Sequence, residues 1–387
     1  MPTRQPALSP KIIVQAVTTI FAGTALHAKQ ILSLAYGVVG TAHAPRASVA
    51  GIGTAMATAR GTTSKHGIKQ VDRLLGNQKI DDDEAQAAHA RFIIGPRPRV
   101  VASLDWTEYG DAGQHQIAVN LVTRHGRATP LLWHTVTDAE LTGRRNEHED
   151  ELLRRFARVR PTTLRDVIIL ADRGFGDVAL YELLRQELGF HFVIRFRGCI
   201  FVQDEHGVTA RARDWVPAAG RVRLLRTARV THRRYQLPSF VAVHQRRMKE
   251  PWLLASSLPW TGPQLVEVYG RRFTCEENFR DQKDPRFGLG TGEVNLSTPA
   301  RRDRLTLLVA LAVALLTMLG AAGESLGLDR QLRANTATRR THSLFRQGRD
   351  YLRGALGKMR DVVALIRAGF TRAFAAQARV HDVLATI

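Results

Sequence analysis

The chain has 387 residues, 44% of them hydrophobic, and carries 56 Lys and Arg against 35 Asp and Glu, a net charge of +21. This hydrophobic content excludes a disordered basic tail, and the length allows about two or three domains with cores of their own. Only Cys199 and Cys275 are present, which excludes a disulfide framework and a zinc site of four cysteines, and fits a reducing, cytoplasmic setting. The excess of positive charge requires an anionic partner, either nucleic acid or an anionic membrane.

The first part of the chain, residues 8–95, is predicted to be helical. Apolar residues recur at helical spacing in KIIVQAVTTIF (residues 11–21) and AKQILSLAYGVV (residues 28–39). In GTTSKHGIKQVDRLLGN (residues 61–77), Thr and Ser at the start and Gly and Asn at the end bracket a short basic helix. Its basic side chains are candidates for contact with DNA phosphates, and ordinary solvation is the alternative. These candidates are Lys65, Lys69 and Arg73.

From residue 98 the pattern changes to strands. The runs RVVASLDWTEY, HQIAVNLVTR and ATPLLWHTV are predicted to be three antiparallel strands, with Gly126 in the turn between the last two. A helix over residues 146–159 then precedes a strand at residues 167–170, a tight glycine-containing turn and a further helix. The run HFVIRFR (residues 191–197) follows as another strand. This order predicts an α/β fold with a sheet of mixed direction.

Three acids stand at positions that suit catalysis. Asp105 is predicted to end the first strand, Asp172 to end the strand at residues 167–170, and Glu276 to lie on a later helix. Acids at the ends of neighbouring strands repel each other unless a cation neutralises them, and Mg²⁺ is bound by a few carboxylates together with substrate phosphates. In a basic chain with a nucleic-acid partner, this grouping predicts phosphodiester chemistry. The alternative for Asp105 and Asp172 is a role as a turn or helix cap.

The segment VYGRRFTCEENFRDQK (residues 268–283) is predicted to be a helix that ends at Asp284-Pro285. At roughly 100° per residue, one face of this helix carries an aromatic hydroxyl, a guanidinium, a carboxylate and an ammonium group. These groups belong to Tyr269, Arg272, Glu276 and Lys283. The alternative is a solvated face with ion pairs between residues four apart.

The last third of the chain contains two stretches that leave alternatives open. Residues 305–323, LTLLVALAVALLTMLGAAG, carry no charge and approach the length that spans a membrane. A buried core helix is the favoured interpretation, and a basic membrane-associated protein is the alternative. Residues 326–387 contain amphipathic basic pieces, predicted to be helices that either contact DNA ends or pack as a C-terminal tail.

Taken together, these motifs resemble the DDE-type transposases of insertion sequences, in particular the insertion-sequence-four family. The predicted helix face is similar to that family's Tyr-Arg-Glu-Lys signature, and LDWTEY and LADRGFGD resemble its first and second aspartate motifs. The resemblance implies an RNase H-like mixed-sheet core in two parts, residues 98–198 and 252–325, interrupted by a β-rich insertion at residues 199–251. It also implies helical flanking regions at residues 1–97, which would bind DNA, and 326–387.

The resemblance further implies roles for individual residues. The catalytic acids would hold two Mg²⁺ ions, with Mn²⁺ as the alternative metal, and would be Asp105, Asp172 and Glu276. The contacts to DNA phosphates would come from Tyr269, Arg272 and Lys283. In relatives an aromatic residue of the insertion stacks on a base extruded from the cut end, and Trp215 is the candidate for that role, with a plain core tryptophan as the alternative.

The implied reaction is cut-and-paste transposition. Water hydrolyses the phosphodiester at the terminal inverted repeat, and the freed 3′ hydroxyl attacks the other strand or target DNA. The implied partners are double-stranded DNA and a second copy of the chain, in a homodimer on paired DNA ends in the bacterial cytoplasm at the nucleoid, with no membrane. The alternative is a catalytically inactive DNA-binding relative of the same fold, although all three acids are present.

Overall fold

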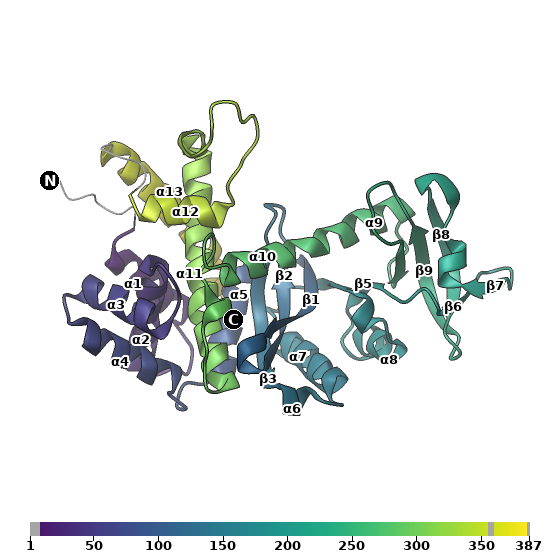
Figure 1. Ribbon diagram of the computed structural model, residues 1–387, viewed down its shortest axis with the longest axis horizontal. Coiled ribbons are helices and arrows are strands. Elements are labelled where there is room, and N and C mark those ends of the chain that lie inside the picture. Colours follow the sequence, from purple (N-terminus) through teal and green to yellow (C-terminus); the bar gives the residue numbers. More distant parts are fainter. Residues whose placement is uncertain (1–7, 355–359, 385–387) are drawn as a thin grey trace.

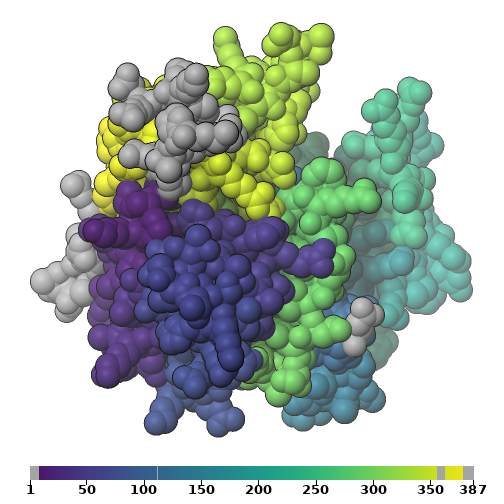
Figure 2. All heavy atoms as spheres, turned by 60° about the vertical axis from the view of Figure 1, so that its left-hand side comes forward, coloured from purple at the N-terminus to yellow at the C-terminus, as the bar shows by residue number. Residues whose placement is uncertain are grey.

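The computed structural model describes residues 8–354 and 360–384. Figure 1 shows a bundle of N-terminal helices, a central sheet beside the long helix α11 (Pro299–Ser325), and a β-rich end. Figure 2 shows the N-terminal helices against both the C-terminal residues and the green segment that includes α11. Both ends of the described chain therefore pack around α11.

The N-terminal region is helical, as predicted. Side chains cap several of these helices, since Ser48, Thr63 and Asp81 each accept a hydrogen bond from the backbone of the helix that follows. The third and fourth helices cross with their backbones in contact, because a Cβ added at Gly67 would lie 2.1 Å from the carbonyl oxygen of Gly53. The five helices are α1 (Pro10–Ile20), α2 (Ala28–His43), α3 (Val49–Arg60), α4 (Ser64–Leu75) and α5 (Asp82–Ile94).

The central sheet confirms the predicted mixed α/β fold. Its first five strands lie in the order β3-β2-β1-β4-β5, with β1, β2 and β3 antiparallel and β1, β4 and β5 parallel. This is the arrangement expected of an RNase H-like core. The strands are β1 (Arg99–Tyr109), β2 (Gln114–Leu121), β3 (Thr129–Thr137), β4 (Asp166–Ala171) and β5 (His191–Arg195).

The insertion extends this sheet. Strand β10 (Trp252–Ser256) pairs with β5 on one side and with β9 (Tyr235–Val243) on the other, so that a single 10-stranded sheet runs through both parts. The remaining strands are β6 (Phe201–Gln203), β7 (Thr209–Arg211) and β8 (Val222–Val230). The segment at residues 199–251 is β-rich as predicted, whereas the division of the chain into separate domains stays a prediction.

Helices cover the two faces of the sheet. One face packs against α7 (Arg145–Val159) and α8 (Val178–Glu182), and the short helix α6 (Asp138–Leu141) follows β3. The other face packs against α9 (Gly262–Gly270), α10 (Thr274–Lys283) and α11. In Figure 1, α9 and α10 form an almost continuous rod from the insertion toward α11. A 3-10 turn, Arg271–Phe273, joins them.

Helix α11 contains the uncharged stretch at residues 305–323. Among the described residues it is the one helix long and apolar enough to cross a membrane, yet 83% of its most apolar window is buried inside the protein. Its buried charges have partners: Arg304 donates to Asp82 of α5 at 2.9 Å, and Asp303 accepts from the backbone of Thr135 on β3 at 3.3 Å. In this structure α11 is a core helix that links the N-terminal bundle to the sheet.

The C-terminal helices α12 (Leu344–Leu352) and α13 (Arg360–Leu384) also pack on α11. The contact with α12 is close, because a Cβ at Gly348 would lie 1.8 Å from the carbonyl oxygen of Leu316. Ile366 and Phe370 of α13 are buried. These helices therefore pack on the core as the tail interpretation expects, and their contact with DNA ends stays a prediction.

Candidate active site

The register of the sheet brings Asp105 and Asp172 together. The parallel ladder between β1 and β4 ends at the pair Leu104 and Ala171, so both aspartates are the first residues beyond it. The prediction that Asp105 ends its strand is wrong, because β1 continues to Tyr109 through antiparallel pairing with β2. Asp105 thus lies inside β1, at the point where only one neighbouring strand remains.

The Asp105 carboxylate is enclosed by three donors. It accepts from the backbone of Trp106 at 3.0 Å, from Nη1 of Arg272 at 2.9 Å and from the Cys275 thiol at 3.1 Å. Burial raises the pKa of Asp105, the Arg272 guanidinium lowers it in part, and the nearby Asp172 raises it again. Two carboxylates, Asp105 and Asp172, therefore lie close together, and the Arg272 guanidinium compensates their negative charge.

Arg272 connects Asp105 to the third acid. Its Nη2 lies 3.1 Å from Oε1 of Glu276, and the whole residue is only 7% exposed. Burial lowers the pKa of Arg272, but Tyr269 and Asp105 outweigh this effect and hold it above the ordinary arginine value. Tyr269 is 1% exposed and packs edge-on against the Trp252 ring. The helix face predicted from the sequence thus exists, but the 3-10 turn interrupts it and part of it faces the core.

Asp172 and Glu276 differ in their surroundings. Asp172 accepts from the backbone of Gly174 at 2.7 Å and caps the 3-10 turn after β4, which is the cap role stated as its alternative. The Glu276 side chain is 55% exposed. Its neighbour Glu277 points elsewhere, to Arg127 and Arg280. Glu276 is therefore the acid of the pair that can reach Arg272.

Lys283 lies at the end of α10, which stops before Asp284-Pro285 as predicted. Its ammonium group is 4.4 Å from the centre of the Tyr109 ring and donates to the carbonyl oxygen of Glu108. Burial and the nearby Arg302 lower the pKa of Lys283 to about 8. Lys283 is thus held at the end of β1, on the strand that carries Asp105.

Two tryptophans lie near the acids or in the insertion, and neither side chain is exposed. Trp215 is 8% exposed, belongs to the core beneath the insertion and donates to the carbonyl oxygen of Val202 at 3.3 Å. This arrangement matches the core-tryptophan alternative and gives no support for stacking on a base. Trp106 points to the opposite face of the sheet from Asp105 and donates to Glu149 at 2.8 Å.

The basic residues of α4 lie far from the acids, at the other end of the molecule from the insertion (Figure 1). Lys65, Lys69 and Arg73 are all exposed on this helix. In the part of the chain that the structure describes, none of them has an ion pair or a hydrogen bond from its side chain. The structure therefore leaves these cations free for an external anion.

The three acids suit a divalent ion in their chemistry, since carboxylate oxygens are the ligands that Mg²⁺ takes. Within residues 8–354 and 360–384, however, no three His, Cys, Asp or Glu side chains are grouped closely enough to hold a metal ion. In this structure the Arg272 guanidinium pairs with both Asp105 and Glu276 and supplies the positive charge there. The three carboxylates are thus ligands of the type that Mg²⁺ binds, and in this structure Arg272 is the cation that pairs with two of them.

Two residues of this site were missed from the sequence. Cys275 is completely buried and its thiol donates to Asp105; its position directly before Glu276 was the available signal. Tyr109 carries Lys283 on its ring and has the Arg302 guanidinium 4.0 Å from its centre. No local pattern indicates this role, because Arg302 is distant in the sequence.

Comparison with known proteins identifies the family of the chain. A family model described as a transposase DDE domain matches residues 66–315, well over half of the chain. A search of curated proteins finds none that matches. The matched range contains Asp105, Asp172 and Glu276, together with the strands and the helix that bring them near Arg272. The chain belongs to the transposases with a DDE domain.

Proposed function

We propose that this chain is the transposase of an insertion sequence of the insertion-sequence-four type, which cuts DNA at terminal inverted repeats and joins the ends to target DNA. The observation that carries the proposal is the register of β1 and β4, which places Asp105 beside Asp172, with Arg272 linking Asp105 to Glu276. The match to the DDE family supports the general part of this proposal, namely that the chain is a transposase with nuclease-type chemistry.

In this proposal Asp105, Asp172 and Glu276 hold divalent ions, two Mg²⁺ or Mn²⁺. When bound, such ions activate an attacking oxygen and stabilise the leaving oxygen of a phosphodiester. The residues of the chain have separate tasks: Arg272, which pairs with Asp105, and Lys283, which lies over the Tyr109 ring at the end of β1, bind DNA phosphates.

Tyr269 has a different position from that expected of a DNA contact. Because it is 1% exposed, we assign to it the support of Arg272, to whose guanidinium it is electrostatically coupled. The buried thiol of Cys275 orients the Asp105 carboxylate in the same way. Both residues thus position the groups that touch DNA or metal.

The proposed partners are double-stranded DNA and a second copy of the chain on paired DNA ends, in the bacterial cytoplasm at the nucleoid. The net charge of +21 supports a polyanionic partner. The exposed cations of α4, Lys65, Lys69 and Arg73, are the proposed contacts of the N-terminal region.

An inactive DNA-binding relative is the second candidate function. The observation in its favour is the ion-paired Arg272, because in this arrangement the acids are neutralised by the protein itself. Such a protein would bind the ends of the element through the same basic surfaces and would not cut them.

Cleavage of labelled DNA that carries the flanking ends of the element, with Mg²⁺, tests the proposal. The intact chain should cut, Glu276→Ala should bind the DNA without cutting it, and Glu277→Ala should cut like the parent. Glu277 is a matched control, since it is the neighbouring glutamate on α10 and pairs away from Asp105. If the intact chain binds these ends and never cuts them, the inactive relative is the correct interpretation.

A further inference from the structure

A groove lies on the sheet face between α9 and α11, with a cavity volume of about 820 Å³. Its floor is apolar and consists of Val101 of β1, Ile168 of β4 and Val122, the residue after β2. Val268 of α9 and Met318 of α11 form parts of its walls. The helices that cover this face of the sheet therefore leave a strip of it open between them.

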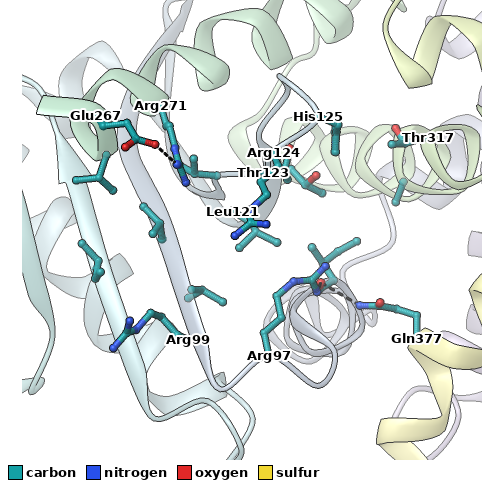
Figure 3. A pocket seen from close by; sticks show the side chains of 18 of the residues that line it. Arg97, Arg99, Leu121, Thr123, Arg124, His125, Glu267, Arg271, Thr317 and Gln377 are labelled. Atoms are coloured by element: carbon teal, nitrogen blue, oxygen red, sulfur yellow. Dashed lines mark hydrogen bonds and ion pairs between the residues drawn. The ribbon is translucent and has the colours of Figure 1, made fainter. Parts of the chain in front are cut away.

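Four arginines from three segments of the chain surround this groove, and Figure 3 shows them around the same open space. They are Arg97, Arg99, Arg124 and Arg271. Glu267 is the one carboxylate among the residues that line it, and no lysine does so. The lining is thus strongly positive and consists of guanidinium groups, whose planar fork suits phosphate oxygens.

These arginines differ in how many partners their side chains have within the protein. Arg97 donates to the carbonyl oxygens of Ile93 and Ile94 at the end of α5. Arg99 and Arg271 each pair with one acid, but their side chains remain 63% and 43% exposed. Arg124, on the loop between β2 and β3, is exposed and has no partner in the described part of the chain. Arg124 is therefore the residue with the most capacity to bind an added anion.

The groove is separate from the candidate active site. Arg271 and Arg272 are adjacent in the sequence, but Arg271 lines the groove whereas Arg272 contacts Asp105. Along β1, Val101 lies in the groove and Asp105 in the site, and between them Ser103 is completely buried beside Cys275. A ligand in the groove would thus be bound on the other side of the rod formed by α9 and α10.

We propose that this groove is a second DNA-binding site, which holds the sugar-phosphate backbone of a DNA segment other than the one at the acids. The inference rests on the proposed function, because an enzyme that joins two DNAs has to hold both. Guanidinium groups around the groove suit the phosphates of a DNA backbone, whose oxygens each guanidinium can bind through paired hydrogen bonds. A second copy of this chain, at +21, is a poor occupant for a positive groove.

The test measures capture of a second duplex. A complex of the full chain with labelled end DNA is formed first, and binding of a differently labelled duplex without terminal repeats is then measured by anisotropy over a range of salt. The variants are Arg124→Ala and the double variant Arg124→Ala, Arg271→Ala. The control is Arg158→Ala, because Arg158 is an exposed arginine of α7, on the opposite face of the sheet.

We expect second-duplex binding to weaken several-fold in Arg124→Ala and further in the double variant. The slope of log K against log salt should fall by about 0.9 for each arginine removed. Arg158→Ala should behave like the parent. Equal capture by parent and both groove variants, or no capture by the parent, would overturn the proposal. Cleavage of the first DNA is measured in the same samples, so a failure of the proposed function is seen separately.

Discussion

Helix α10, with the 3-10 turn before it, and helix α4 both carry cations, but these cations differ in burial and in their partners. In the 3-10 turn before α10, Arg272 is 7% exposed and bound to two acids, and at the end of α10 Lys283 lies over the Tyr109 ring. On α4, Lys65 and its neighbours Lys69 and Arg73 are exposed and have no partner in the described structure. The cations near α10 are bound to neighbouring groups of the protein, whereas those of α4 point into solvent.

This difference has a physical cause. A buried charge loses its hydration and is tolerated only with a compensating partner, so its position is fixed before DNA arrives. An exposed charge keeps its hydration and costs the fold almost nothing, so its main effect is on the attraction of a polyanion. Substitutions at the two helices should therefore separate stability from DNA affinity.

The largest effect is expected from Arg272→Ala. Removal of the guanidinium leaves Asp105 buried beside Asp172 without a cation, and loss of one partner of a buried pair costs roughly 3 to 5 kcal/mol of unfolding free energy. Denaturant unfolding measures this. Arg280→Ala on the adjoining helix α10 is the control, because the Arg280 side chain is 63% exposed and its pair with Glu277 should contribute less than about 1 kcal/mol.

A further substitution sharpens this test. Asp105→Asn in the Arg272→Ala background removes the charge that has lost its partner, so it should recover part of the lost stability. If Arg272→Ala unfolds at the same denaturant concentration as Arg280→Ala, the ion pair at the site is not part of the fold and the contrast with α4 is wrong.

An intermediate effect is expected from the pH dependence at Lys283. Its pKa is lowered to about 8, so it carries its charge below this pH and loses it as the pH rises from 7 to 9. If Lys283 binds a DNA phosphate, affinity should fall a few-fold over this window. The charged form is the one that burial disfavours, so the fold itself gains stability as the pH rises from about 8 toward the ordinary lysine value of about 10.4.

Lys283→Arg provides the matched control, since an arginine keeps its charge throughout this window. In that variant the DNA affinity should change less between pH 7 and pH 9 than in the parent. The groups that face Lys283 are Tyr109, Arg302 and the backbone of Glu108, and they are the same in both proteins. Parallel pH profiles for the two proteins would mean that Lys283 does not bind phosphate.

The sequence predicted those features that depend on local pattern. Alternating and continuous apolar runs gave the strands and their order, and the flanking cap residues gave the limits of α4. The run RVVASLDWTEY matches β1 in full, whereas Asp105 was wrongly expected at its end, because the point at which β4 stops pairing with β1 depends on the fold and not on the run itself. For the same reason nothing local indicated that the insertion would continue the core sheet through β10.

The prediction of the candidate site was limited in the same way, because it also depends on contacts between distant residues. The helical wheel placed Tyr269 and Arg272 on one face with Glu276, but it could not show that Tyr269 would be buried against Trp252. The ion pair between Arg272 and Asp105 joins residues that are distant in the sequence, so only the fold brings them together. Sequence spacing thus indicated which residues share one side of the segment, and packing decided which of them are buried.

The smallest effect on the fold is expected at α4. The triple variant Lys65→Ala, Lys69→Ala, Arg73→Ala should keep its unfolding free energy within about 1 kcal/mol, because each side chain is solvated and alanine favours a helix. Its affinity for DNA should nevertheless fall, with a loss of about 0.9 in the salt slope for each contact removed. Lys29→Ala, an exposed lysine on α2, is the control. An unchanged slope would mean that α4 is an ordinary solvated helix, and exposure alone would then not identify a DNA contact in this protein.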